Sequence, residues 1–216
     1  MKTQHHSSPA VTPQALAWDG NHLWVSSRDL GALYKIDIGR WRIVEEIDPP
    51  GIVWAGVSSG DGNMYFTIGK GLNDDRYIYR YSPDEGFTKM FACPDFTGSF
   101  LSFDGKHLYL SQWYKERILK FNDRGTILRN IDVGAEICGH TVAKDMMFVL
   151  RGRENKDHPT KSEEWHIARL DPHKETPHVE DIAAVPFAAR SLTFDGEQFW
   201  SNYREKNTII SFALPF

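Results

Sequence analysis

The sequence predicts an all-β protein, a five-bladed β-propeller of four-stranded antiparallel blades whose ring is closed by the N-terminal segment. A pair of alternating apolar runs around a turn, which is Asp-Gly in four of the copies, recurs five times along the 216 residues. The copies recur about every 43 residues, an interval typical of four-stranded propeller blades. No stretch shows the sustained 3.6-residue apolar period of a helix. An antiparallel sandwich also has regularly spaced short strands, but it does not repeat its sequence in this way.

The hairpin that opens each blade is visible when the chain is aligned on itself. Alternating apolar residues on both sides of an Asp-Gly dipeptide are the strongest short-range signal for a β-hairpin. The fourth copy has lost the glycine. The five copies are residues 16–26, 57–67, 101–111, 140–149 and 192–201.

A third apolar run and a fourth, more polar run follow each of the first four hairpins and complete the blade. The fifth blade ends soon after its third run, residues 209–212. Because a propeller needs its last blade completed, we expect residues 3–11 to supply the missing outer strand. Their composition favours a strand only weakly, although proline is tolerated on an edge. The predicted blades of this single domain are 14–48, 55–92, 99–133, 138–184, and 190–216 together with 3–11.

Composition argues against several classes of protein. Lys and Arg number 25 against 29 Asp and Glu, and the net charge of −4 argues against a nucleic-acid partner or an anionic membrane surface. The longest apolar stretch, residues 182–189, is too short to span a bilayer. No apolar run follows Lys2, so no signal peptide is expected. The 2 cysteines fit a cytoplasmic location, and no metal site and no cofactor are predicted.

A ligand site is predicted at the central mouth, on one face of the disc. The links between blades and the loops from second to third strand share this face, whereas the Asp-Gly turns lie on the opposite one. The residues at these positions differ from blade to blade while the framework repeats, and such mouths bind ligands. The predicted contacts are Gln14, Ser99, His140 and Arg190 from the inner strands and Trp113, Tyr114, Arg151 and Tyr203 from the loops.

His140 interrupts the apolar pattern of the inner strands. The other blades have Leu16, Val57, Leu101 and Leu192 at the equivalent positions. A histidine here acts as a base, a ligand contact or a metal ligand, and it is the candidate catalytic residue. The alternative is a buried histidine whose two ring nitrogens are satisfied by the backbone. Cys138 lies two residues away, which makes a Cys–His nucleophile pair conceivable, but no third group or oxyanion donor is identifiable.

Basic and aromatic side chains gather on the predicted loop face. The basic ones either hold an anionic small ligand through an arginine fork or form a solvated rim of ion pairs. The aromatic ones, Trp54 among them, either stack on a ligand or pack between blades. The additional basic residues on this face are Arg28, Lys70, Lys115, Arg153 and Arg204.

Blade four carries a charged insertion from Arg153 to Trp165. A loop of this length is either functional or irregular. Its acidic residues alternate with lysines, so no calcium-loop spacing emerges. The insertion is the predicted contact for a protein partner.

Blade one resembles a known family of propellers. Residues 12–16 (Thr-Pro-Gln-Ala-Leu), the Asp19-Gly20 turn and residues 23–27 (Leu-Trp-Val-Ser-Ser) are similar to the opening motif of the glutaminyl-peptide cyclotransferase propellers. The resemblance implies five blades. The family's active-site glutamate falls on Val25, so ordinary glutaminyl cyclase activity is not expected. Residues 61–67 are similar to the repeats of streptogramin B lyases, which have seven blades.

The sequence favours a binding module that holds a small molecule or a peptide at the mouth. Two alternatives stay open: a cyclotransferase- or lyase-like enzyme with a rearranged active site, and a protein-interaction scaffold. A cyclase needs a carboxylate near the substrate's amine, for which Asp29 and Glu205 are the nearest candidates. A scaffold needs an exposed apolar patch.

Overall fold

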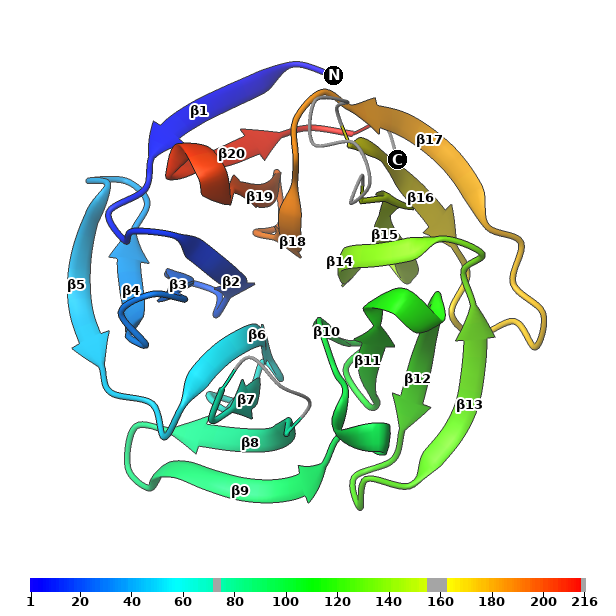
Figure 1. Ribbon diagram of the computed structural model, residues 1–216, viewed down its shortest axis with the longest axis horizontal. Coiled ribbons are helices and arrows are strands. Elements are labelled where there is room, and N and C mark those ends of the chain that lie inside the picture. The colour runs from blue at the N-terminus through cyan, green and yellow to red at the C-terminus, as the bar shows by residue number, and fades with distance from the viewer. Residues whose placement is uncertain (72–74, 155–162, 215–216) are drawn as a thin grey trace.

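Five four-stranded antiparallel sheets, formed by the described residues, surround a central axis (Figure 1). The computed structural model describes residues 1–71, 75–154 and 163–214. Each sheet runs from an inner strand beside the axis to an outer strand at the rim. The predicted five-bladed propeller is therefore confirmed. Within the described ranges, no helix is long and apolar enough to cross a membrane.

Consecutive strands build each blade, except that the first strand of the chain completes the last blade. Blade 1 comprises β2 (Pro13–Trp18), β3 (Leu23–Ser27), β4 (Leu33–Asp37) and β5 (Arg42–Ile47). Blade 2 comprises β6 (Ile52–Ser58), β7 (Met64–Gly69), β8 (Tyr77–Ser82) and β9 (Gly86–Ala92). Blade 3 comprises β10 (Leu101–Phe103), β11 (Leu108–Gln112), β12 (Arg117–Phe121) and β13 (Ile127–Asp132). Blade 4 comprises β14 (Glu136–Ala143), β15 (Met146–Arg153), β16 (Glu164–Leu170) and β17 (Glu180–Val185). Blade 5 comprises β18 (Arg190–Phe194), β19 (Phe199–Tyr203), β20 (Thr208–Phe212) and β1 (Thr3–Ser7).

The N-terminal strand closes the ring, as predicted (Figure 1). β1 pairs antiparallel with β20 along its whole length. The ring of His6 packs against Trp41 of blade 1 and Trp200 of blade 5, at centroid distances of 4.4 and 5.5 Å. The indole of Trp41 also donates a hydrogen bond of 2.7 Å to the carbonyl of Ser7. β1 therefore fastens blade 5 to blade 1, although its polar sequence has little strand preference of its own.

A side-chain clasp explains why the hairpin motif repeats. In blade 1, one oxygen of Asp19 accepts hydrogen bonds from the backbone N–H groups of Asn21 and His22. The other oxygen accepts from the indole of Trp24 at 2.7 Å, which ties the turn to the second strand. The same clasp joins Asp104 to Tyr109 and Asp195 to Trp200.

The turn glycine meets a backbone requirement that blade 4 meets differently. Gly20 has a φ of 100°, a conformation that residues with a Cβ rarely adopt. In blade 4 only Lys144 and Asp145 separate β14 from β15, and both have positive φ, 49° and 63°. Positive φ at both central residues is characteristic of a two-residue type I′ hairpin turn. Blade 4 therefore keeps its hairpin without the glycine.

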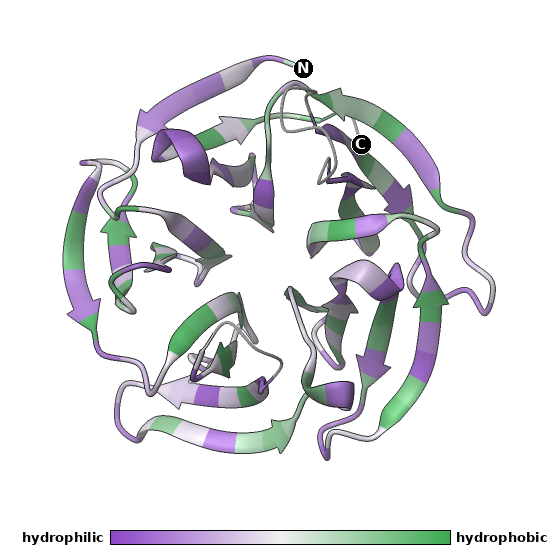
Figure 2. Ribbon diagram, in the orientation of Figure 1, coloured by the Kyte–Doolittle hydropathy of each residue, from purple (hydrophilic) through white to green (hydrophobic). Residues whose placement is uncertain are grey.

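Aromatic side chains fill the spaces between neighbouring blades. In blade 1 the inner and second strands bury nearly every residue, the third strand buries three of its five residues, and hydrophilic residues are interspersed along the strands (Figure 2). Such aromatic pairs add about 0.5–1.5 kcal/mol each beyond the burial of their surface. The contacts between blades include Trp24 with Phe66 (5.8 Å), Phe91 with Phe121 (5.6 Å) and Phe148 with Phe199 (4.9 Å).

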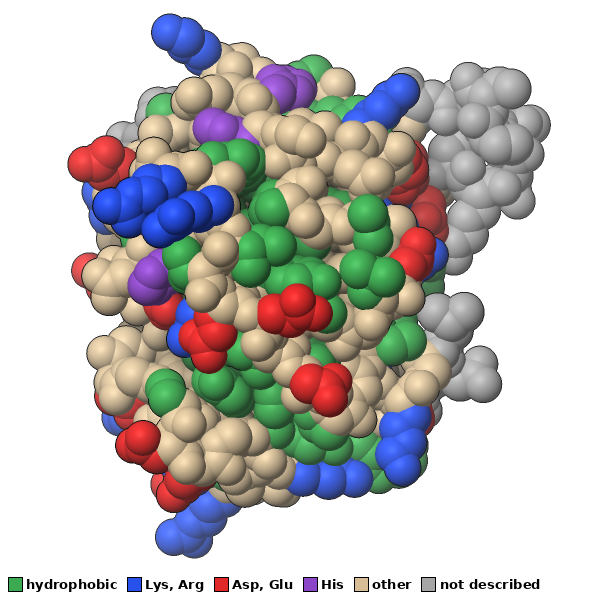
Figure 3. All heavy atoms as spheres, turned by 90° about the vertical axis from the view of Figure 1, so that its left-hand side faces the viewer, with side chains coloured by type: hydrophobic (Ala, Val, Ile, Leu, Met, Phe, Trp, Pro, Cys, Tyr) green, Lys and Arg blue, Asp and Glu red, His purple; other side chains and the backbone are tan. Residues whose placement is uncertain are grey.

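The outer wall of the disc is more exposed than the inner strands. Nearly every residue of β5 is exposed, including Ile43 and Val44. On the side of the disc that carries β5, apolar side chains are interspersed with acidic and basic ones (Figure 3).

Candidate functional site

A cavity of about 480 Å³ opens at the mouth of the propeller, on the face opposite the Asp-Gly turns. Its volume lies within the range of roughly 300–1,000 Å³ that small-molecule sites occupy. All five blades contribute to its wall. The lining residues are Gln14 and Arg28 of blade 1, Trp54 and Arg76 of blade 2, Thr97, Ser99, Phe100, Gln112, Trp113, Tyr114 and Lys115 of blade 3, Glu154 of blade 4, and Arg204 of blade 5.

Short 3₁₀ turns bring loop side chains to this mouth. η2 (Trp113–Lys115) follows the second strand of blade 3, and η3 (Arg204–Lys206) follows that of blade 5. Each turn ends in a left-handed residue, Glu116 in blade 3 and Asn207 in blade 5. These turns reverse the chain within one 3₁₀ turn, so their first residues stay beside the opening.

One wall of the cavity is basic. The guanidinium of Arg204 donates a hydrogen bond of 2.6 Å to the side-chain oxygen of Gln14, and its contact with Glu205 is looser at 3.7 Å. Burial lowers the pKa of Arg204, and the positive charges of Arg190 and Arg28 lower it further. Positive charge is therefore crowded on the blade 5 and blade 1 side of the mouth.

The facing walls are aromatic. The guanidinium of Arg76 stacks over the ring of Trp54 at 4.0 Å and donates to the carbonyl of Gly98 at 2.6 Å. In blade 3, the ring of Trp113 packs between Phe100 and Tyr114, at centroid distances of 6.1 and 5.7 Å. The mouth thus offers flat apolar surfaces opposite a cationic one.

Four of the eight predicted contact residues line this cavity and four do not. Gln14, Ser99, Trp113 and Tyr114 line it. Arg151 points to a shallower hollow, where it pairs with Asp181 at 2.8 Å. Tyr203 lines another hollow and stacks on Phe187. Arg190 and His140 are each only 1% exposed.

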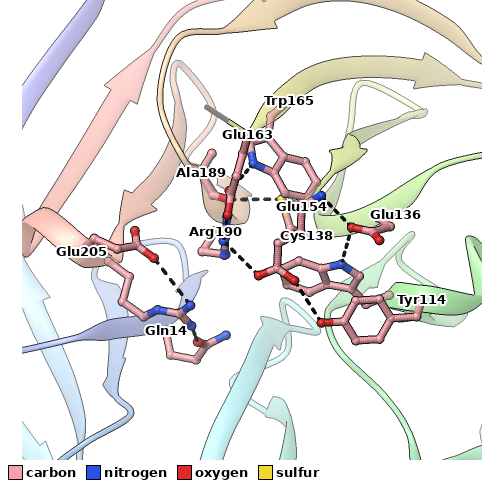
Figure 4. A network of polar contacts seen from close by, with 12 residues as sticks. Gln14, Tyr114, Glu136, Cys138, Glu154, Glu163, Trp165, Ala189, Arg190 and Glu205 are labelled. Atoms are coloured by element: carbon pink, nitrogen blue, oxygen red, sulfur yellow. Dashed lines mark hydrogen bonds and ion pairs between the residues drawn. The ribbon is translucent and has the colours of Figure 1, made fainter. Parts of the chain in front are cut away.

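Arg190 lies in a buried ionic cluster beneath the mouth (Figure 4). Its two terminal nitrogens each donate a hydrogen bond of 2.8 Å to a different oxygen of Glu163. Glu154 lies 3.7 Å away, and the rings of Trp113 and Trp165 lie 5.3 and 5.4 Å from the guanidinium carbon. Arg190 therefore fastens blade 5 to blade 4.

His140 is buried with both ring nitrogens hydrogen-bonded. Nε2 lies 3.0 Å from the carbonyl of Phe100, to which it must donate, so Nδ1 accepts from the hydroxyl of Ser102 at 2.8 Å. This arrangement defines the neutral tautomer and links the inner strands of blades 3 and 4. The geometry matches the buried-histidine alternative, except that one partner is a side chain.

Stability is expected to depend on pH through His140. Burial lowers the pKa of His140 to about 4, although the hydrogen bond to Phe100 raises it. Between about pH 6.5 and 4 the unfolded chain therefore binds the proton more readily, so stability falls as the pH decreases. We expect this residue to remove roughly 3 kcal/mol across that range. His6 contributes in the same direction, because burial also lowers its pKa.

Denaturant unfolding of the wild type and the His140→Leu variant at pH 7.5 and 4.5 measures this effect. At pH 7.5 the variant should lose about 2 kcal/mol, because Ser102 and the Phe100 carbonyl lose their buried partner. At pH 4.5 the two proteins should be closer in stability. Equal pH slopes in both would contradict a depressed pKa at His140.

The two cysteines lie in the core. Cys138 is fully buried, and its thiol donates a hydrogen bond to the carbonyl of Ala189. Among the described contacts, Cys138 and His140 are not hydrogen-bonded to each other. Burial raises the pKa of Cys138 and raises that of Cys93 to about 12. In the described part of the chain, no group of three or more His, Cys, Asp or Glu side chains is placed to hold a metal ion.

Several lining residues were not among the predicted contacts. Aligning the loops between second and third strands was enough to place Arg28, Lys115 and Arg204 on this face, whereas Trp54 lies on the inner strand of blade 2. Arg76 lies in the loop between β7 and β8, and Thr97 and Phe100 lie in the link between blades 2 and 3, on either side of the predicted contact Ser99. Much of the insertion predicted to contact a protein partner, residues 155–162, falls outside the described residues.

No protein-family model and no curated protein sequence matches the chain. Solved structures share its fold at low sequence identity. A glutaminyl cyclase from Myxococcus xanthus has a TM-score of 0.72 at 12% identity, covering 99% of this chain and 94% of that one. The PQQ-bound aldose sugar dehydrogenase of Streptomyces coelicolor has a TM-score of 0.58 at 14% identity over 97% of each chain. The hydrazine synthase of Kuenenia stuttgartiensis has a TM-score of 0.58 at 14% identity, and this chain covers 62% of it, less than two thirds. These likenesses show the propeller fold, which the glutaminyl cyclase shares over nearly its whole length.

Proposed function

We propose that this protein is a β-propeller binding module that holds a small molecule or a peptide at its central mouth. The observation that supports this most directly is the cavity of about 480 Å³ to which all five blades contribute. The clasps of the hairpins and the aromatic contacts between blades recur around the ring, whereas the lining side chains differ from blade to blade. A concave site with apolar walls and a few polar groups is the usual form of a small-ligand site.

A fragment screen by ligand-observed NMR tests this proposal with two tryptophan variants. Thr97 lines the cavity and is half-buried, so Thr97→Trp should fill part of the mouth. Asn21 is exposed in the Asp-Gly turn on the opposite face, so Asn21→Trp adds the same ring away from the cavity. Fragments that bind the wild type should be lost in Thr97→Trp and kept in Asn21→Trp. Equal binding by all three proteins would contradict a ligand site at the mouth.

The competing function is that of a glutaminyl cyclase. The residue at the position of that family's active-site glutamate, Val25, does not support it. Val25 is fully buried on β3, where it pairs with Leu16 of the inner strand. The carboxylate that lines the cavity, Glu154, is engaged by the hydroxyl of Tyr114 and by Arg190. An acid or base for cyclisation has to reach the substrate's amine from the mouth.

We therefore expect no pyroglutamate formation above the uncatalysed rate when the protein is incubated with a peptide that has an N-terminal glutamine. Mass spectrometry of the peptide measures the product, with the Myxococcus xanthus glutaminyl cyclase as the positive control. Robust turnover that disappears in Glu154→Gln would overturn this expectation and make Glu154 the catalytic carboxylate.

A further inference from the structure

The cationic side chains of the mouth face the cavity, and the acidic ones that balance them lie at its rim. Among the described residues, Arg28, Arg76, Lys115 and Arg204 line the cavity, against one lining carboxylate, Glu154. The acidic partners described for Arg28, Arg204 and Lys115 do not line it: the side chains of Asp29, Glu205 and Asp95 are 55%, 49% and 57% exposed. In the described part of the mouth, the surface that a ligand meets is therefore mainly positive.

The arginines nearest the inner strands are loosely paired. Arg28 lies 3.6 Å from Asp29, and Arg204 lies 3.7 Å from Glu205. The Arg190–Glu163 pair below them has two contacts of 2.8 Å. The Arg204 side chain is only 19% exposed, and the charges of Arg190 and Arg28 act on it. An anion placed beside Arg204 would relieve this repulsion and form short charge-assisted hydrogen bonds.

The opposite side of the cavity suits a flat group. Trp54 and Trp113 both line it, and the guanidinium of Arg76 already lies over the Trp54 ring. An aromatic ring placed here can stack on an indole face or on the guanidinium plane. The basic wall and the aromatic walls bound one cavity, so one ligand of small size meets both.

We infer that the ligand of this site is a small planar organic anion, with a carboxylate held by Arg204 and Arg28 and an aromatic ring held against Trp54 and Trp113. This inference rests on the proposed function of the mouth as a binding site. A carboxylate fits a planar ligand better than a phosphate ester does, because its two oxygens can lie in the plane of the attached ring and meet a planar guanidinium, whereas the phosphate group is tetrahedral.

Calorimetric titration at low salt with four probes tests the class of ligand. The probes are 2-naphthoate, the uncharged 2-naphthamide, the non-aromatic cyclohexanecarboxylate and 2-naphthyl phosphate. We expect 2-naphthoate to bind about ten-fold or more tightly than 2-naphthamide, because the amide cannot form the charge-assisted hydrogen bonds. We expect it to bind roughly several-fold more tightly than cyclohexanecarboxylate, which cannot stack on the indoles, and more tightly than 2-naphthyl phosphate, whose anionic group is tetrahedral. Binding of the amide as tightly as the acid, or tighter binding of the phosphate ester, would overturn the inference.

Variants of the basic wall test whether it holds the carboxylate. Arg204→Gln should weaken 2-naphthoate binding about ten-fold or more while leaving 2-naphthamide binding unchanged. Arg28→Gln, at a more exposed position, gives the same test if Arg204→Gln does not fold. Arg169→Gln is the matched control. Arg169 lies on the third strand of blade 4, pairs with Glu180 and does not line the cavity. Equal weakening of acid and amide by Arg204→Gln would also contradict the inference.

The two proposals fail in different ways. If screened fragments bind at the mouth and Thr97→Trp removes them, but charge and aromaticity do not affect affinity, the mouth is a binding site and the inferred ligand class is wrong. If Thr97→Trp binds 2-naphthoate as tightly as the wild type does, both the site and the ligand class are wrong.

Discussion

Replacing Arg190 by methionine is expected to lower the free energy of unfolding by about 3–5 kcal/mol, because breaking a buried ion pair leaves the other charge without its partner. Arg190 is 1% exposed, and it holds Glu163 through two hydrogen bonds of 2.8 Å. Methionine fills a similar volume, so the loss reports on charge more than on packing. Urea unfolding at pH 7.5, followed by tryptophan fluorescence, measures the difference.

Substitution of the partner, Glu163, gives the matched control. Glu163 is partly exposed at 19%, and Arg190 keeps Glu154 at 3.7 Å, so Glu163→Gln should destabilise the protein less than Arg190→Met does. Burial raises the pKa of Glu163, but hydrogen bonds from Arg190 and Trp165 hold it below its usual range. The pair therefore contributes at neutral pH, and its contribution is lost only as the pH falls through the carboxyl range. If Arg190→Met lowers stability by less than about 1 kcal/mol, the pair does not fasten the two blades.

Removal of residues 1–11 is the second large effect. The deletion takes away β1 and its ladder with β20, and it takes His6 out of the cluster with Trp41 and Trp200. It also leaves the outer edge of β20 without a strand to pair with. We expect a loss on the order of 4 kcal/mol and a fall in Tm of roughly 10 °C, from the scaling of ΔTm with ΔΔG in chains of this size.

Trp41→Ala separates the aromatic contact from the ladder. It removes the tilted ring contact with His6 and the hydrogen bond to the Ser7 carbonyl while leaving the strand in place. We expect about half the effect of the deletion, near 2 kcal/mol, because Trp41 is only partly buried. Scanning calorimetry of the wild type and both variants gives the comparison. A deletion with an unchanged Tm would mean that β1 does not contribute to ring closure.

The fold was predictable because its signals are local and repeated. Each hairpin is encoded within about a dozen residues, and the clasp from Asp19 to Trp24 shows why aspartate and an aromatic residue recur at this spacing. The N-terminal strand was predictable only by counting strands, since its own residues do not favour a strand. Pairing with β20 and the contact with Trp41 decide its conformation, and both are tertiary interactions.

The site was predictable in position more than in detail. Gln14 and Ser99 line the mouth as their place on the inner strands suggests, but Arg190 at the equivalent place does not. The inner strand of blade 1 has a register shift like that of β18, so this irregularity does not set Arg190 apart from Gln14. The Arg190 side chain meets Glu163, which lies 27 residues away in the sequence. A repeat alignment shows equivalent backbone places, but it does not show which distant side chain becomes a partner.

The pairing of β1 with β20 also has a consequence for biosynthesis. During translation, residues 3–7 leave the ribosome long before residues 208–212, so this strand has no partner while the first four blades form. An unpaired strand with an apolar sequence would be prone to pair with other nascent chains. Gln4, His5 and His6 make β1 a polar segment that remains hydrated during this interval. The weak intrinsic preference that makes the strand hard to predict thus protects the newly made chain until blade 5 can close.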